Sequence, residues 1–177
     1  MDDIIEAGFQ KLTEKIQEKE KEREKLSEEV RKNDAELLAR MAALTAPIIG
    51  KIGLNMLYKG KQDSKGELYD TAFHPNKMIV LGKTEPVKFR PDDISKPVSD
   101  QFCVLSEDGA FYELMYTSDQ FGVDSYLNPL TPAEAIQVYG YEVMFMLYRA
   151  MRDYLKGQED LVAALEMTMA FVFPQEK

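Results

Sequence analysis

The residues best suited to chemistry are a single histidine, His74, and a single cysteine, Cys103. A cysteine beside a histidine can act as a nucleophile, because the imidazole takes up the thiol proton. The neighbours of both residues argue against such a pair. His74 precedes Pro75 in a predicted turn, where we expect an exposed loop residue, and Cys103 lies in a predicted apolar strand, where we expect an inert, buried thiol. We therefore predict no catalytic residue.

Acidic pairs are the other candidates for acid–base or metal chemistry, and they stand at Asp92-Asp93, Glu107-Asp108 and Asp119/Asp124. Residues 118–124 lack the spacing of a calcium loop, which needs oxygen ligands at alternate positions and a distant glutamate. We interpret all three pairs as parts of surface turns. The sequence predicts no metal site and no cofactor, and it leans away from an enzyme.

A glycine pattern within a basic stretch is the one nucleic-acid signal. The residues concerned are Gly50, Lys51, Gly53, Lys59 and Lys61. Residues 48–56 resemble the Ile-Gly-x-x-Gly loop of K-homology RNA-binding domains, where two glycines between helices let the backbone clamp a nucleic-acid strand. The resemblance implies an RNA- or anion-binding module over Gly50–Lys65. Close packing of a helix through a small-residue face is the other interpretation of the same glycines.

Charge is spread unevenly along the 177 residues, whose formal net charge is −9. Residues 1–45, 46–98 and 99–177 carry −3, +3 and −9. The acidic balance argues against non-specific binding to nucleic acid or anionic membranes, because phosphate contacts need clustered cations. No apolar run approaches the roughly 20 residues of a membrane span. A lone cysteine forms no intrachain disulfide, so we expect a cytoplasmic protein with no membrane contact.

The elements that position these residues begin with a long amphipathic helix, predicted from about Asp3 to Leu44. Its apolar residues recur at alternating steps of four and three, which is the pattern of a coiled-coil seam. A few polar residues interrupt that seam. The predicted partner-helix interface comprises Ile5, Phe9, Leu12, Ile16, Lys19, Arg23, Leu26, Val30, Asn33, Leu37 and Leu44.

The middle of the seam carries Lys19 and Arg23 in place of apolar residues. Glu20 and Glu22 flank them in the heptad, so a partner helix could supply carboxylates to the seam cations. Polar seam residues lower stability but fix register and partner. Forty helical residues span roughly 60 Å, more than the compact body, so part of the helix should project. The alternative is a seam that folds back on the C-terminal helices.

Residues 46–177 should form a compact α+β domain behind the projecting helix, residues 1–45. Pro47 predicts a break and a short second helix over 47–58. Strands follow over 67–73 and 77–81, joined by a turn at His74, with a short edge strand over 87–90. The strongest hairpin signal joins strands over 101–105 and 110–117.

The C-terminal part should contain two apolar helices. Thr131 and Glu134 form a capping box that begins the first helix, which we expect to end at Gly157, and the second spans 159–171. Because the first is apolar nearly all round, it should be buried. The predicted fold class is α+β, with a coiled-coil-like N-terminal helix, an antiparallel sheet of four or five strands and two apolar C-terminal helices.

The predicted function is that of a non-enzymatic interaction or scaffold protein, assembled through the N-terminal helix with further copies of itself or with a helical protein partner. Nucleic acid is not the expected partner. Two alternatives stay open: the RNA- or anion-binding module described above, and a small-ligand protein or enzyme with a pocket between sheet and C-terminal helices.

Overall fold

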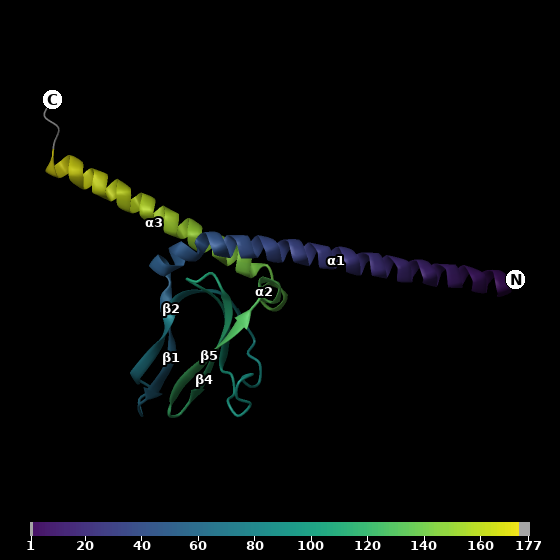
Figure 1. Ribbon diagram of the computed structural model, residues 1–177, viewed down its shortest axis with the longest axis horizontal. Coiled ribbons are helices and arrows are strands. Elements are labelled where there is room, and N and C mark those ends of the chain that lie inside the picture. Colours follow the sequence, from purple (N-terminus) through teal and green to yellow (C-terminus); the bar gives the residue numbers. More distant parts are fainter. Residues whose placement is uncertain (1, 174–177) are drawn as a thin grey trace.

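The computed structural model describes the backbone of residues 2–173 and the side chains of residues 10–173. Two helices, α1 and α3, overlap at their inner ends and together form a long crossbar, and a small barrel hangs from its middle (Figure 1). The elements are α1 (Asp2–Ile52), β1 (Leu54–Gln62), β2 (Leu68–Thr84), β3 (Asp100–Ser106), β4 (Phe111–Asp119), β5 (Gly122–Leu130), α2 (Pro132–Tyr139) and α3 (Glu142–Val172). The predicted α+β class is confirmed, and the sheet is closed as a five-stranded antiparallel barrel.

The long N-terminal helix is confirmed, but the predicted break at Pro47 and the separate helix over 47–58 are wrong. Helix α1 continues through Pro47 to Ile52, and β1 begins two residues later. A proline removes one backbone hydrogen bond from a helix. Ala42 and Ile49, on either side of Pro47, are 1% and 0% exposed, so packing on the barrel outweighs that loss.

Strand β2 makes closure of the barrel possible. A ring of five strands cannot have antiparallel neighbours throughout unless one strand bends so strongly that its two parts pair with their neighbours in different directions. Residues Leu68–Met78 of β2 pair with β1, and Met78–Thr84 pair with β3, so Met78 is the pivot between the two ladders. The ring closes where β1 pairs antiparallel with β5, from Lys59↔Asp124 to Lys61↔Gly122.

The turn predicted at His74 is wrong, because the segment is a bulge within β2. Asn55 of β1 pairs with Lys77 and Leu57 pairs with Phe73, so β2 carries two extra residues between these pairs. Pro75 has no N–H to donate to a ladder, and a bulge is one of the few places where a sheet tolerates it. The bulge bends the strand instead of ending it.

The hairpin of β3 and β4 is confirmed, and its turn contains Gly109 at a φ of 82°. The edge strand predicted over 87–90 is reduced to a single bridge, Phe89↔Pro97. Strand β5 has no separate counterpart in the sequence prediction, because its polar and proline residues conceal the alternation of a strand.

The C-terminal helices divide at a different place from the one predicted. The capping box is confirmed, since Glu134 N donates to Thr131 Oγ1 at 3.2 Å and Thr131 N donates to Glu134 Oε2 at 2.7 Å. Helix α2 ends at Gly140, whose φ of 72° favours glycine, and α3 then runs straight through Gly157. The predicted end at Gly157 is therefore wrong.

The expected burial of the C-terminal helices is also wrong. Only Val143 and Leu147 of α3 are buried, and every residue from Leu155 to Phe173 is exposed. The sheet closes on itself, so it leaves no open face for these helices to cover. The main core lies between the crossbar and one end of the barrel, and it joins Leu38 and Ile49 of α1 to Leu147 of α3.

Candidate interaction surface

The predicted seam of α1 is uncovered along the described part of the helix. Its six apolar members there expose between 41% and 78% of their surface: Leu12, Ile16, Leu26, Val30, Leu37 and Leu44. The seam cations Lys19 and Arg23 and the polar Asn33 are exposed as well. The side chains of the remaining two, Ile5 and Phe9, lie outside the described residues.

The body of the protein binds the opposite face of α1. Leu38, Ala42, Thr45 and Ile49 are buried, and they recur at steps of four, three and four. At 100° per residue this row lies roughly 120° around the helix from Leu37 and Leu44, the nearest apolar residues of the seam. Leu44 therefore stays 78% exposed even where α1 crosses the barrel. In the described residues the seam does not fold back onto the C-terminal helices.

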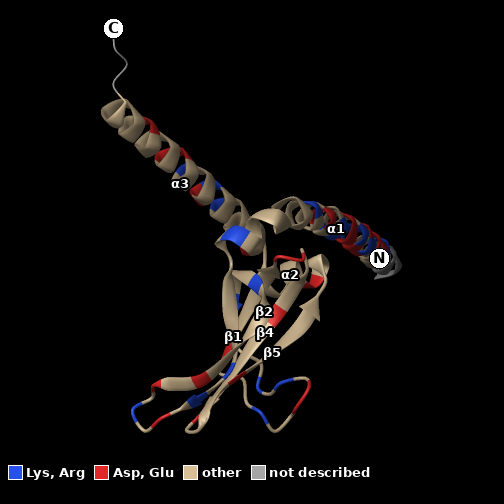
Figure 2. Ribbon diagram, turned by 60° about the vertical axis from the view of Figure 1, so that its left-hand side comes forward, with Lys and Arg blue, Asp and Glu red and all other residues tan. Residues whose placement is uncertain are grey.

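Alternating charge surrounds the seam (Figure 2). Lys19 Nζ donates to Glu22 Oε2 at 2.5 Å, one turn along the same helix. This hydrogen bond and the charge of Glu22 raise the pKa of Lys19, and the same hydrogen bond and the charge of Lys19 lower the pKa of Glu22. Both side chains are more than half exposed, so the pair contributes little to the stability of one chain.

The glycine pattern does not form the loop that the K-homology resemblance implies. Gly50 and Lys51 lie in the last turns of α1, and Gly53 is followed directly by β1 instead of a second helix. A Cβ on Gly53 would lie 2.7 Å from Ile49 O and 3.0 Å from Met78 N. This glycine is thus needed for the close approach of helix and strand. Lys59 and Lys61 lie on β1, and Lys61 pairs with Asp70 at 2.8 Å.

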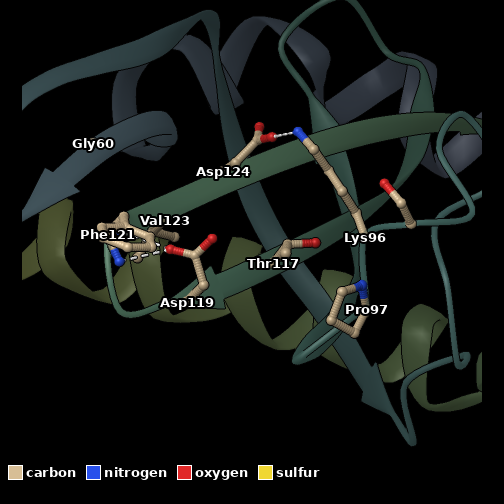
Figure 3. Close-up of a pocket in the computed structure, with 10 residues that line it drawn as sticks. Gly60, Lys96, Pro97, Thr117, Asp119, Phe121, Val123 and Asp124 are labelled. Carbon is tan, nitrogen blue, oxygen red and sulfur yellow. Dashed lines mark hydrogen bonds and ion pairs between the residues drawn. The ribbon is translucent and has the colours of Figure 1, made fainter.

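A hollow of about 320 Å³ opens at the end of the barrel that lies away from the crossbar (Figure 3). Lys96 lies in the irregular segment between β2 and β3, residues 85–99. It faces Asp124 of β5 and forms an ion pair with it. Arg90, whose side chain is 6% exposed, pairs with the same carboxylate at 3.0 Å and with Asp92 at 2.5 Å. Two cations and two carboxylates thus neutralise one another, and they tie residues 85–99 to the barrel.

These pairs correct part of the sequence interpretation of the acidic residues. Asp93, Asp108 and Asp119 accept backbone N–H groups in tight turns, as predicted. Asp92 and Asp124 instead hold the buried Arg90, and its hydrogen bond lowers the pKa of Asp92.

A buried polar cluster is centred on Glu113 of β4, which is 7% exposed. Its carboxylate accepts hydrogen bonds from Gln101 at 2.5 Å, Tyr139 at 3.0 Å and Asn128 at 3.2 Å. Three donors satisfy the charge, as a buried carboxylate requires. Cys103 pairs with Glu113 in the sheet register, and burial together with that charge raises the pKa of the thiol to about 12. The predicted burial of the Cys103 thiol is confirmed.

The prediction that His74 is exposed is wrong, because the bulge in β2 turns this side chain into the barrel. His74 is 8% exposed, its Nε2 lies 2.9 Å from Ser125 Oγ, and Tyr58 meets its ring edge-on. Ser125 Oγ donates in turn to Leu57 O at 2.8 Å. These hydrogen bonds join strands β1, β2 and β5. The Ser125 hydroxyl is inaccessible to solvent, because the residue is 1% exposed.

Burial lowers the pKa of His74, so stability should depend on pH. The unfolded chain takes up a proton near the ordinary value of 6.5, whereas the native chain does so only at lower pH. The free energy of unfolding should therefore fall as pH is lowered from 7 to about 5.5. Urea unfolding at several pH values measures it.

His74→Gln is the control for this pH dependence, because the chain has no other histidine. The variant should be less stable at pH 7 and should vary less with pH over the same range. Equal pH dependence in the two proteins would contradict the assignment to His74.

Among residues 10–173 no group of three or more His, Cys, Asp or Glu side chains is placed to hold a metal ion. None of the helices within the described residues is long and apolar enough to cross a membrane. No family model matches the chain, and neither a curated protein nor a solved structure shows significant similarity to it. The proposal for the function therefore rests on the geometry of the exposed helices.

Proposed function

We propose that this chain is a non-enzymatic interaction protein, assembled by pairing α1 with the same helix of a second copy. The observation that carries the proposal is the uncovered seam, which lies on the face of α1 turned away from the barrel. All residues from Gln10 to Asn33 are exposed. In proteins most of the stability of a helix comes from packing of its apolar face. A partner that covers the seam would supply that packing.

The charged seam positions favour a parallel partner with the same sequence. In a parallel coiled coil, the residue at Arg23 packs beside the partner's position 22, and the residue at Lys19 packs beside position 20. Both positions are glutamates. Lys19 and Arg23 would thus each meet a carboxylate of the other copy, and two copies in register would form four such contacts. A shifted register would lose them.

Asn33 supports the same register. Asn33 shares the heptad position of Lys19 and would face its counterpart in an aligned parallel pair, where a polar seam residue fixes register at some expense of stability. The six apolar seam residues from Leu12 to Leu44, taken from two copies, would bury on the order of 1,000 Å², near the lower limit of a specific interface. The proposed pairing is therefore specific and of moderate affinity.

We place this assembly in the cytoplasm. The support is the single cysteine, Cys103, which is fully buried and suits a reducing compartment.

Light scattering on the full chain tests the proposed assembly. Between about 1 and 50 μM, the range in which moderate interfaces assemble, we expect a mass of at least twice the 20.2 kDa of one chain. The mass should fall on dilution. A constant monomer mass across this range would refute the proposal.

A further inference from the structure

Each end of the crossbar projects beyond the barrel, and we call these two projecting parts overhangs. The first is the N-terminal part of α1, and the second is the C-terminal part of α3. Residues 155–173 extend beyond the barrel on the side opposite to the N-terminus (Figure 1). Leu161, Val162 and Leu165 expose 52%, 54% and 55% of their surface. These residues form part of an apolar surface that no described residue covers.

This apolar surface continues a row that is already packed within the chain. Leu147 is fully buried and Met151 packs against the same core cluster. At alternating steps of four and three, the row proceeds from Leu147 and Met151 to Tyr154, Gln158, Leu161, Leu165, Thr168 and Val172. That is a second heptad seam. The first part is covered by the protein itself, and the part beyond Tyr154 is free.

The row of residues on the C-terminal overhang contains no ionised side chain. Between Gly157 and Phe173 the only ionised side chains are Glu159, Asp160 and Glu166, and all three fall at outward heptad positions. Two parallel copies would therefore bring no like charges together across the row. The same acidic residues disfavour an anionic lipid surface, which attracts amphipathic helices through lysine and arginine.

The two polar residues of the row are compatible with self-pairing. Thr168 Oγ1 donates to Ala164 O at 2.9 Å, so its hydroxyl is satisfied within the helix. Gln158 can hydrogen-bond to its counterpart when two copies lie parallel and in register. Leu155, Val162 and Met169 border the row and widen it. Two overhangs would bury on the order of 1,000 Å², comparable with the α1 pairing.

We propose that residues 155–173 are a second self-association helix, which pairs in parallel with the same segment of another copy. The α1 seam points away from the core, whereas the α3 row continues the core-facing side. A straight helix drifts by only about 20° per heptad, so the row still faces that side two heptads further on. One partner therefore cannot cover both seams. The copies would join alternately through α1 and α3 into a linear array, and this last step rests on the function proposed above.

Selective blocking of each seam in the full chain tests the inference. Leu26→Glu with Val30→Glu blocks α1, and Leu161→Glu with Leu165→Glu blocks α3; all four residues are exposed, so the fold should be kept. Sedimentation equilibrium should give chains longer than dimers for the native protein, dimers when either seam is blocked, and monomers when both are. Ala163→Glu with Ala170→Glu adds the same charge to the outward face of α3 and should leave the native masses unchanged.

The two proposals fail in different ways. If the chain with a blocked α1 is monomeric, α3 does not self-associate and the further inference is wrong. If the chain with a blocked α3 is monomeric, the α1 pairing is wrong instead.

Cross-linking gives a second measurement that does not depend on glutamate variants. Thr168→Cys places a thiol in the row, whereas Ala163→Cys places one on the outward face, and the native Cys103 is buried. In a mild oxidant, Thr168→Cys should give disulfide-linked pairs at least ~10-fold faster, because parallel alignment brings the two thiols within bonding distance. Equal rates for the two variants would overturn the proposal.

Discussion

Leu26→Glu with Val30→Glu should weaken the α1 pairing by at least ~100-fold in dissociation constant, because burying each side chain contributes about 1.5–3 kcal/mol. The substitutions also place four new carboxylates side by side in the seam of a dimer. Both residues are more than half exposed in the single chain, so its fold should not change. Leu161→Glu with Leu165→Glu as a background isolates the α1 contact, and sedimentation equilibrium measures it.

Gln10→Glu with Gln17→Glu is the matched control in the same background. Both glutamines lie on α1 at an outward heptad position, seven residues apart. The control adds the same charge to the same helix, and it should leave the dissociation constant within about a factor of three, as expected for surface charge changes. Equal weakening by the two variants would mean that net charge, and not the seam, controls the association.

Gly122→Ala should destabilise the fold by about 2–3 kcal/mol or more, since inserting a methyl group into a closely packed site forces backbone shifts. Gly122 pairs with Lys61 where β5 meets β1, at the closure of the barrel. A Cβ at this position would run into the carbonyl oxygen of Gly60, which is backbone and cannot move aside as a side chain does. Urea unfolding measures the loss.

Gly157→Ala is the matched control, with the opposite sign expected. Gly157 lies within α3, and nothing lies within 4 Å of the position its Cβ would occupy. Alanine is preferred over glycine inside a helix by up to about 1 kcal/mol, so thermal unfolding of α3 should shift to a higher temperature. If both glycine variants were equally destabilised, the clash at the barrel closure would not be the cause.

Local patterns made part of the fold predictable. The seam of α1, the capping box at Thr131 and the hairpin around Gly109 each depend on residues a few positions apart, where spacing alone decides the geometry. The helix that carries the seam, the capping box and the hairpin are present in the structure as predicted. The exposure of the seam could also be anticipated, because forty helical residues are longer than the body they adjoin.

The remaining features depend on contacts between distant residues. A proline at position 47 favours a helix end, but the packing of Ile49 on the barrel decides the outcome. His74 beside a proline resembles a turn, whereas the bulge in β2 buries it against Ser125, 51 residues away. Nothing local indicates that β1 and β5 close a ring, and without closure the apolar α3 was expected to cover an open sheet.

The overlap of α1 and α3 at the middle of the crossbar also has a mechanical consequence. The two helices run in the same direction and project from opposite sides of the core (Figure 1). A pull between the two overhangs would load the packing of Leu38 and Ile49 against Leu147 in shear, with all contacts resisting at once. The barrel lies beside this line of force. A tension between the two ends of the crossbar would therefore be borne by the helices, and the barrel would hang beside them unstretched.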